Sequence, residues 1–205
     1  MGRGFSRNSQ TDRSSIVCGT RDRPLFALIQ MLIPGDPAPS FDLPAAIDDR
    51  IDHAALRGIT ADLIVLFFYP RDFSFICPTE VAGFNKAIKL FAEENATILG
   101  ASVDSAESHS RWARELGGLG YPLVADENGE TARSYGVFDE KERVAIRATF
   151  VIDSERKIAF SSATSINVGR SVSETLRIVR AIRTGRLCPA EWTPGVDFGP
   201  DDVKY

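Results

Sequence analysis

The sequence predicts an α/β fold with three layers, in which helices flank a central sheet. Two observations lead to this prediction. Apolar runs short enough for strands alternate along the chain with longer segments whose apolar residues recur at helical spacing, and a strand hairpin followed by a helix closes the order. The 205 residues fit one domain of ordinary size. A chain of this length buries roughly 70% of its unfolded surface, so its core needs neither a disulfide nor a structural metal.

The first thirty residues differ in charge from the rest of the chain. They contain five arginines and two aspartates, a net charge of +3, whereas residues 31–205 contain 19 basic and 26 acidic residues, a net charge of −7. We expect residues 1–30 to be a disordered or dispensable basic extension and residues 31–205 to form the domain. Two alternatives stay open. The apolar stretch over residues 25–33, which follows arginines, is compatible with a secretory signal, and the arginine- and serine-rich composition is compatible with an organellar transit segment.

The domain begins with a proline-dense segment over residues 34–44, in which the prolines favour extended backbone. Residues 63–69 then form an unbroken apolar run that ends at Pro70. Its aromatic and branched residues predict a central strand covered on both faces. Residues 79–94 carry apolar side chains at helical spacing, which predicts an amphipathic helix. These side chains belong to Val81, Phe84, Ile88 and Phe91.

The remaining elements continue the alternation. We expect, in order, a strand over 97–103, a helix over 105–116, a short strand over 123–125, a short helix over 130–135, a strand hairpin formed by 144–152 and 157–161, and a closing helix over 171–183. The closing helix has one apolar face, made of Val172, Leu176, Val179 and Ile182. This order places the helices against one sheet.

The composition excludes several classes of partner. The net charge of −4 and the isoelectric point near 5.3 argue against nucleic acid, because phosphate contacts need clustered lysines and arginines. No segment reaches the roughly 18 consecutive apolar residues that would cross a bilayer. The Asp48, Asp49 and Asp52 cluster lacks the spacing of a metal loop and indicates solvated turns, as does Asp126. Gly117–Gly120 is too short for a dinucleotide fingerprint, so we expect no metal and no bound cofactor.

The three cysteines are Cys18, Cys77 and Cys188, and no pair of them has the spacing of a zinc site or a redox dithiol motif. Cys77 falls between the predicted strand over 63–69 and the next helix, where open α/β sheets bind their ligands. With Pro78 in the first turn, the sulfur would face the unpaired amides and the positive end of the helix dipole. Both favour the thiolate. Position alone leaves an inert buried cysteine as the alternative.

The residues around Cys77 resemble the signature of a known family. Residues 68–80, Phe-Tyr-Pro-Arg-Asp-Phe-Ser-Phe-Ile-Cys-Pro-Thr-Glu, are similar to the Pro-x-x-x-(Thr/Ser)-x-x-Cys signature of the peroxiredoxins, thiol peroxidases with a thioredoxin fold. Further stretches agree with the family in the same order, beginning at Gly35, Ser102, Pro122, Tyr135, Arg147, Gly169 and Leu187. The resemblance implies a thioredoxin-like fold with a central mixed sheet.

The resemblance also implies a role for each matching residue. Cys77 would attack the terminal peroxide oxygen as a thiolate and become a sulfenic acid. Ser74 would hydrogen-bond to the sulfur and the peroxide, and Pro70 would shield the site from water. Arg147 would stabilise the thiolate and orient the peroxide oxygens.

Two further residues look like the pair that holds Arg147 in place in this family, namely Glu80 and Arg170. Cys188, in a Cys-Pro-Ala-x-Trp setting, looks like the resolving cysteine of the typical two-cysteine group, which includes the peroxidase component of bacterial alkyl hydroperoxide reductase. The resemblance thus implies a resolving-cysteine arm at the end of the domain. It also implies a disulfide between Cys77 and the Cys188 of the other subunit in a homodimer. His109 is expected to be structural rather than a base.

Taken together, these roles imply a cytoplasmic thiol peroxidase that reduces hydrogen peroxide and alkyl hydroperoxides. A thioredoxin-like or flavoprotein-linked disulfide reductant would recycle it. The resemblance also implies a ring of dimers, which we expect Glu107 to weaken because an aromatic residue often occupies its position. The alternative on the same scaffold is a redox-switched chaperone or peroxide sensor, which would not turn over peroxide.

Overall fold

The computed structural model describes Met1, residues 30–47 and residues 50–197. Apart from its two ends, Met1 and Gln30, the predicted basic extension lies outside the described residues, and so do Cys18, Asp48 and Asp49.

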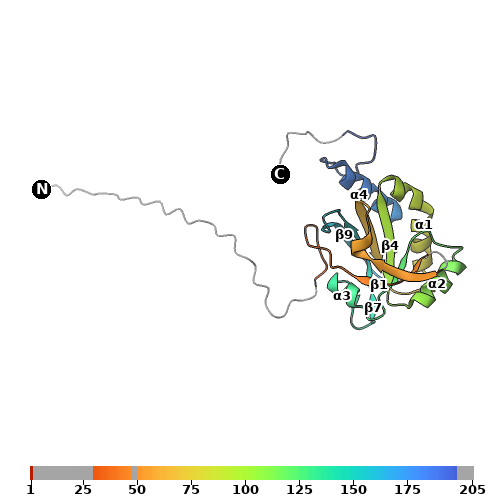
Figure 1. The fold of residues 1–205 in the computed structure, drawn as a ribbon. Helices are drawn as coiled ribbons and strands as arrows, with labels where there is room; N and C mark the ends of the chain where they lie inside the picture. Colours follow the sequence, from red (N-terminus) through yellow and green to blue (C-terminus); the bar gives the residue numbers. More distant parts are fainter. Residues whose placement is uncertain (2–29, 48–49, 198–205) are drawn as a thin grey trace.

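Seven strands form a mixed sheet in the order β2-β1-β5-β4-β3-β8-β9 (Figure 1). These strands are β1 (Asp42–Ile47), β2 (Arg50–Ala55), β3 (Leu63–Phe68), β4 (Ala96–Ser102), β5 (Leu123–Ala125), β8 (Arg147–Ile152) and β9 (Ile158–Thr164). The short strands β6 (Phe138–Asp139) and β7 (Val144–Ala145) pair separately. The helices are η1 (Leu56–Gly58), α1 (Cys77–Glu93), α2 (Ala106–Glu115), α3 (Glu130–Ser134) and α4 (Val172–Thr184). The prediction of a mixed sheet flanked by helices is confirmed.

The central strand β3 places side chains in two hydrophobic cores. It pairs in parallel with β4 and antiparallel with β8, and all six of its residues are buried. Leu63, Val65 and Phe67 face one core, to which α1, α2 and α4 contribute. The intervening residues Ile64, Leu66 and Phe68 face the other core, which α3 covers (Figure 1). Each fully buried side chain of this size contributes roughly 1.5–3 kcal/mol, so β3 fixes the point from which the next loop and α1 start.

The helices α1 and α4 pack beside each other and run in the same direction (Figure 1). Near their beginnings, a Cβ atom built on Gly83 would lie 3.1 Å from the Val172 side chain. Near their ends, Arg180 pairs with Glu94 at 3.1 Å. The first residue of α1 and the segment that follows α4 therefore lie at opposite ends of this helix pair.

The hairpin formed by β1 and β2 was not predicted, because residues 34–44 were expected to be merely extended. Pro44 lies within β1 opposite His53 of β2, while β5 pairs only with Ala45 and Ala46. A proline is tolerated there because its missing N–H is not needed by β5. Most of β2 is exposed and polar, so it lacks the apolar alternation that marks a strand.

Several boundaries also differ from the prediction. The strand expected over residues 144–152 is divided into β7 and β8, since β7 turns away to pair with β6. Helix α1 begins two residues earlier than expected, at Cys77, and Asp52 lies in β2 rather than in a turn. None of the described helices is long and apolar enough to cross a membrane. Nor do three potential metal-ligating side chains gather anywhere in the described ranges.

A substitution at Gly136 tests how residues 30 and 31, at the start of the domain, pack on the rest of it. The φ of Gly136 is 70°, and a Cβ atom there would clash with the backbone of Gln30 and Met31. We expect Gly136→Ala to lower the free energy of unfolding by more than about 1 kcal/mol, because alanine strains left-handed backbone and displaces residues 30 and 31. Urea denaturation compares it with Gly58→Ala, whose Cβ would meet nothing within 4 Å. Equal stabilities would contradict this packing.

Candidate active site

Cys77 is the first residue of α1 and is completely buried. The loop that joins β3 to α1 delivers it there, and Pro78 occupies the first turn of the helix. No side chain in the described part of the chain caps this helix start, so none of these side chains satisfies the amides of the first turn. The sulfur therefore lies at the positive end of a 17-residue helix, an environment that favours a negative charge on it.

Arg147 contacts both the sulfur and a buried carboxylate. It is the first residue of β8, and its Nη1 donates to Cys77 Sγ at 3.2 Å and to Glu80 Oε2 at 2.5 Å. Arg147 is 4% exposed and Glu80 is 2% exposed. The Nε of Arg147 donates to the Ile166 carbonyl at 3.1 Å, and this bond fixes the plane of the guanidinium. A buried, fixed positive charge thus lies directly against the thiol.

Glu80 lies between two arginines. Its Oε1 accepts hydrogen bonds from Arg170, at 3.0 Å from Nε and 2.8 Å from the backbone N–H. The Arg170 guanidinium also donates to the carbonyls of Phe68 (2.5 Å) and Ala148 (2.9 Å), at the ends of β3 and β8. Burial lowers the pKa of Arg170, and the ion pair with Glu80 opposes that shift. Both oxygens of Glu80 are consequently committed to holding guanidinium groups.

Ser74 and Pro70 lie in the loop before Cys77. The Ser74 Oγ is buried and has no hydrogen-bond partner among the described residues. A hydroxyl can both donate and accept, so this atom is available to a polar ligand that enters the site. Pro70 is buried two residues after the end of β3 and brings no N–H of its own to the site.

Cys188 is not brought together with the other predicted site residues. It is half-buried just beyond the end of α4, where its Sγ lies 3.5 Å from Thr184 Oγ1. Because α1 and α4 run in the same direction, Cys77 and Cys188 lie at opposite ends of the helix pair. The 17 residues of α1 span about 25 Å at 1.5 Å per residue. Both cysteines are free thiols.

A polar network beside the loop was not anticipated from the sequence. Asp72, two residues after Pro70, pairs with His109 of α2 at 2.9 Å, and both side chains are fully buried. The hydroxyl of Tyr69 donates to the same carboxylate at 2.8 Å. Asp72 belongs to the signature segment, but no pattern in the sequence links it to a histidine 37 positions away.

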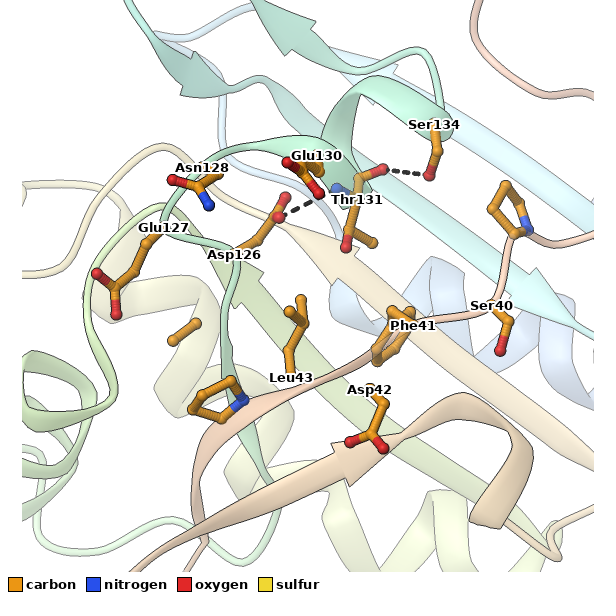
Figure 2. A pocket seen from close by; sticks show the side chains of 13 residues that line it. Ser40, Phe41, Asp42, Leu43, Asp126, Glu127, Asn128, Glu130, Thr131 and Ser134 are labelled. Carbon is orange, nitrogen blue, oxygen red and sulfur yellow. Dashed lines mark hydrogen bonds between the residues drawn. The ribbon is translucent and has the colours of Figure 1, made fainter.

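A cavity of about 570 Å³ lies elsewhere (Figure 2). Its walls come from residues 39–44 and from the segment between β5 and α3, and none of the predicted site residues lines it. Burial raises the pKa of Asp126 in this cavity, but both oxygens of that carboxylate accept amides of α3, from Thr131 and Ala132. No cysteine is among the residues that line this cavity.

Comparisons with known proteins show which family the chain is similar to. The model of the AhpC/TSA family matches residues 34–161. Peroxiredoxin prdx-2 of Caenorhabditis elegans is 42% identical over 180 residues, covering 83% of this chain and 90% of that protein. Peroxiredoxin-2 of Bos taurus is 41% identical over 173 residues, covering 80% and 87%. Among solved structures, the reduced 2-Cys peroxiredoxin of Plasmodium vivax is similar with a TM-score of 0.76 at 31% identity, covering 82% and 92%. Mycobacterium tuberculosis AhpC has a TM-score of 0.73 at 34% identity, covering 80% and 99%.

The contact between Arg147 and Cys77 can be tested with a charge-conserving substitution. We expect Arg147→Lys to slow the reaction of Cys77 with hydrogen peroxide by about 10–100-fold, because a lysine cannot keep both the sulfur and Glu80 within hydrogen-bond distance. Stopped-flow tryptophan fluorescence measures the rate. Arg180→Lys, which alters the surface pair with Glu94, is the matched control and should react like the unmodified protein. Equal rates for the two variants would exclude a role for the Arg147 contact.

Proposed function

Because the chain belongs to the AhpC/TSA family of peroxiredoxins and is a thiol peroxidase, we propose that Cys77 is the cysteine that attacks the peroxide. The observation that carries this proposal is the buried contact of Arg147 with both Cys77 Sγ and Glu80. A fixed guanidinium against the sulfur, together with the positive end of α1, favours the thiolate over the neutral thiol.

In the first step, the Cys77 thiolate attacks the terminal oxygen of the peroxide. The S–O bond forms as the O–O bond breaks, and the departing oxygen takes up a proton and leaves as water or an alcohol. Cys77 becomes a sulfenic acid. Arg147 stabilises the negative charge that develops on the departing oxygen, and the unpartnered Ser74 hydroxyl hydrogen-bonds to the bound peroxide. Pro70 keeps water away from the intermediate.

In the second step, a Cys188 thiol condenses with the sulfenic acid, forming a disulfide and releasing water. The two Cα atoms of a disulfide lie about 4.4–6.8 Å apart. Within one chain the two cysteines lie at opposite ends of α1 and α4, which supports attack by the Cys188 of a second copy. Cys77 is completely buried, so the loop before α1 must open for this step.

The sheet offers an edge at which a second copy can bind. Strand β9 is the last strand in the described sheet, and after it Ile166 and Val168 are 61% and 50% exposed. An exposed edge strand readily pairs with the same strand of another copy, which supports a homodimer. Dimers could assemble further into a ring through the exposed side chains of Phe73 and Phe75, and the exposed Glu107 would make that assembly sensitive to salt.

The disulfide is returned to two thiols by a thioredoxin-like or flavoprotein-linked reductant. Such a cycle suits a reducing compartment, and we place the protein in the cytoplasm on this ground. Hydrogen peroxide and alkyl hydroperoxides are the proposed substrates. The relatives do not favour the alternative of a redox-switched chaperone or peroxide sensor.

The two cysteines should respond differently to substitution. We expect Cys77→Ser to abolish peroxide consumption, because a serine hydroxyl is not ionised at neutral pH. Cys188→Ser should consume about one equivalent and then stall as the sulfenic acid. Peroxide assays with thioredoxin measure both, and mass spectrometry of the peroxide-treated protein without reductant identifies the linked peptides.

Wild-type turnover by Cys77→Ser would refute the assignment of the attacking thiol. A Cys77 to Cys188 bridge within a monomer would refute the intersubunit disulfide while leaving the role of Cys77 intact.

A further inference from the structure

A closed polar network lies behind the loop that carries Pro70, Ser74 and Cys77. Its centre is the Asp72 carboxylate, which accepts hydrogen bonds from Tyr69 Oη (2.8 Å) and Ser108 Oγ (2.8 Å). His109 Nδ1 lies 2.9 Å from the same carboxylate and 3.3 Å from Tyr69 Oη. The side chains of Asp72 and His109 have no exposed surface. A buried carboxylate is strongly disfavoured unless donors and a positive charge compensate it.

The geometry indicates where that positive charge resides. While Nδ1 of His109 faces Asp72, its Nε2 lies 3.2 Å from the Val124 carbonyl oxygen. A carbonyl and a carboxylate can only accept, so a ring that satisfies both contacts carries a proton on each nitrogen. Burial raises the pKa of Tyr69 well above its usual range, and Asp72 adds to this rise. The hydroxyl of Tyr69 is thus a donor, and a His109 ring that bears both protons would supply the positive charge.

The same network fixes the backbone of the loop. The Asp72 N–H donates to Asp104 Oδ2 at 2.8 Å. The next residue, Phe73, has a φ of 52°, a conformation that is strained for a residue other than glycine and persists only where its surroundings enforce it. Its ring packs 6.1 Å from Trp112, and Arg111 lies 5.1 Å above it. Helix α2, through its side chains, therefore holds the loop in this conformation.

We propose that His109, as an imidazolium paired with Asp72, is a positioning residue that holds the loop closed, with Cys77 against Arg147. This inference rests on the proposed function, in which Cys77 attacks in the closed loop and is resolved in the open one. The pair has opposite effects on the two steps. It favours attack on the peroxide, which needs the closed loop, and it opposes disulfide formation, which needs the loop to open.

The protonation of His109 can be measured without any assay of activity. The chain has two histidines, so His109 is the only histidine in His53→Gln. Nitrogen-15 NMR of the reduced His53→Gln protein at pH 7 should show both ring nitrogens of His109 bearing protons. A neutral ring with one protonated nitrogen would overturn the proposal, because a neutral pair of Asp72 and His109 supplies no positive charge.

The effect on the two steps is measured by rapid kinetics. In His109→Gln we expect the reaction of Cys77 with peroxide to slow by about tenfold, roughly the effect of one charge-assisted hydrogen bond, and the later formation of the disulfide to accelerate. His53→Gln, at an exposed position, should leave both rates unchanged. If His109 had only a structural role, His109→Gln would slow both steps or leave both rates unchanged. Either result would overturn the proposal.

A second variant covers the case in which His109→Gln does not fold. Ser108→Ala removes one donor from Asp72 but keeps the pair, and it should change both rates in the same directions by a smaller factor. Unchanged rates in a folded Ser108→Ala protein would count against the network. Failure of the proposed function itself would be recognised separately, as peroxide consumption by Cys77→Ser.

Discussion

The buried carboxylate of Glu80 is the interaction on which the geometry around Cys77 depends. It joins the first turn of α1 to the start of β8 through Arg147 and to the segment before α4 through Arg170. Removing one partner from a buried ion pair commonly destabilises a protein by about 3–5 kcal/mol, because the other charge is left uncompensated. Here one carboxylate compensates two guanidinium groups. The position of the positive charge at the sulfur therefore depends on Glu80, although the partners of Glu80 are the two arginines and not the sulfur.

The parallel arrangement of α1 and α4 places the two thiols at opposite ends of the helix pair. One end of the helix pair holds Cys77, completely buried and in contact with Arg147, in a site that suits the proposed attack on a peroxide. The other end carries Cys188, which is half-buried and accessible to a second chain. The cycle proposed for the two thiols therefore uses a partner subunit and a loop that opens. The network of Asp72 and His109 lies where it can set the balance between the closed and open loop.

Much of this fold could be predicted from periodicity. The parts that were not predicted have one physical cause in common. The strand β3 and the helices α1 and α4 have strong apolar patterns, because they form the buried centre. The β1–β2 hairpin is polar and contains Pro44, so its pairing depends on partners that are distant in sequence. At the site, Cys77 could be singled out by its position, but Arg147, Glu80 and Arg170 could be named only through the family resemblance. No sequence pattern shows that the Ser74 hydroxyl lacks a hydrogen-bond partner among the described residues, or that Asp72 pairs with His109. Both features depend on how distant segments pack.

The most direct test of this account is the rate at which Cys77 reacts with hydrogen peroxide after Glu80 loses its charge. Stopped-flow fluorescence of Glu80→Gln should give a rate constant at least about tenfold below that of Glu94→Gln, a control that removes the carboxylate paired with Arg180 near the far end of α1. Circular dichroism establishes that both variants are folded. Equal rate constants in two folded variants would show that the reactivity of Cys77 does not depend on the arginines that Glu80 holds, and would contradict the account at its centre.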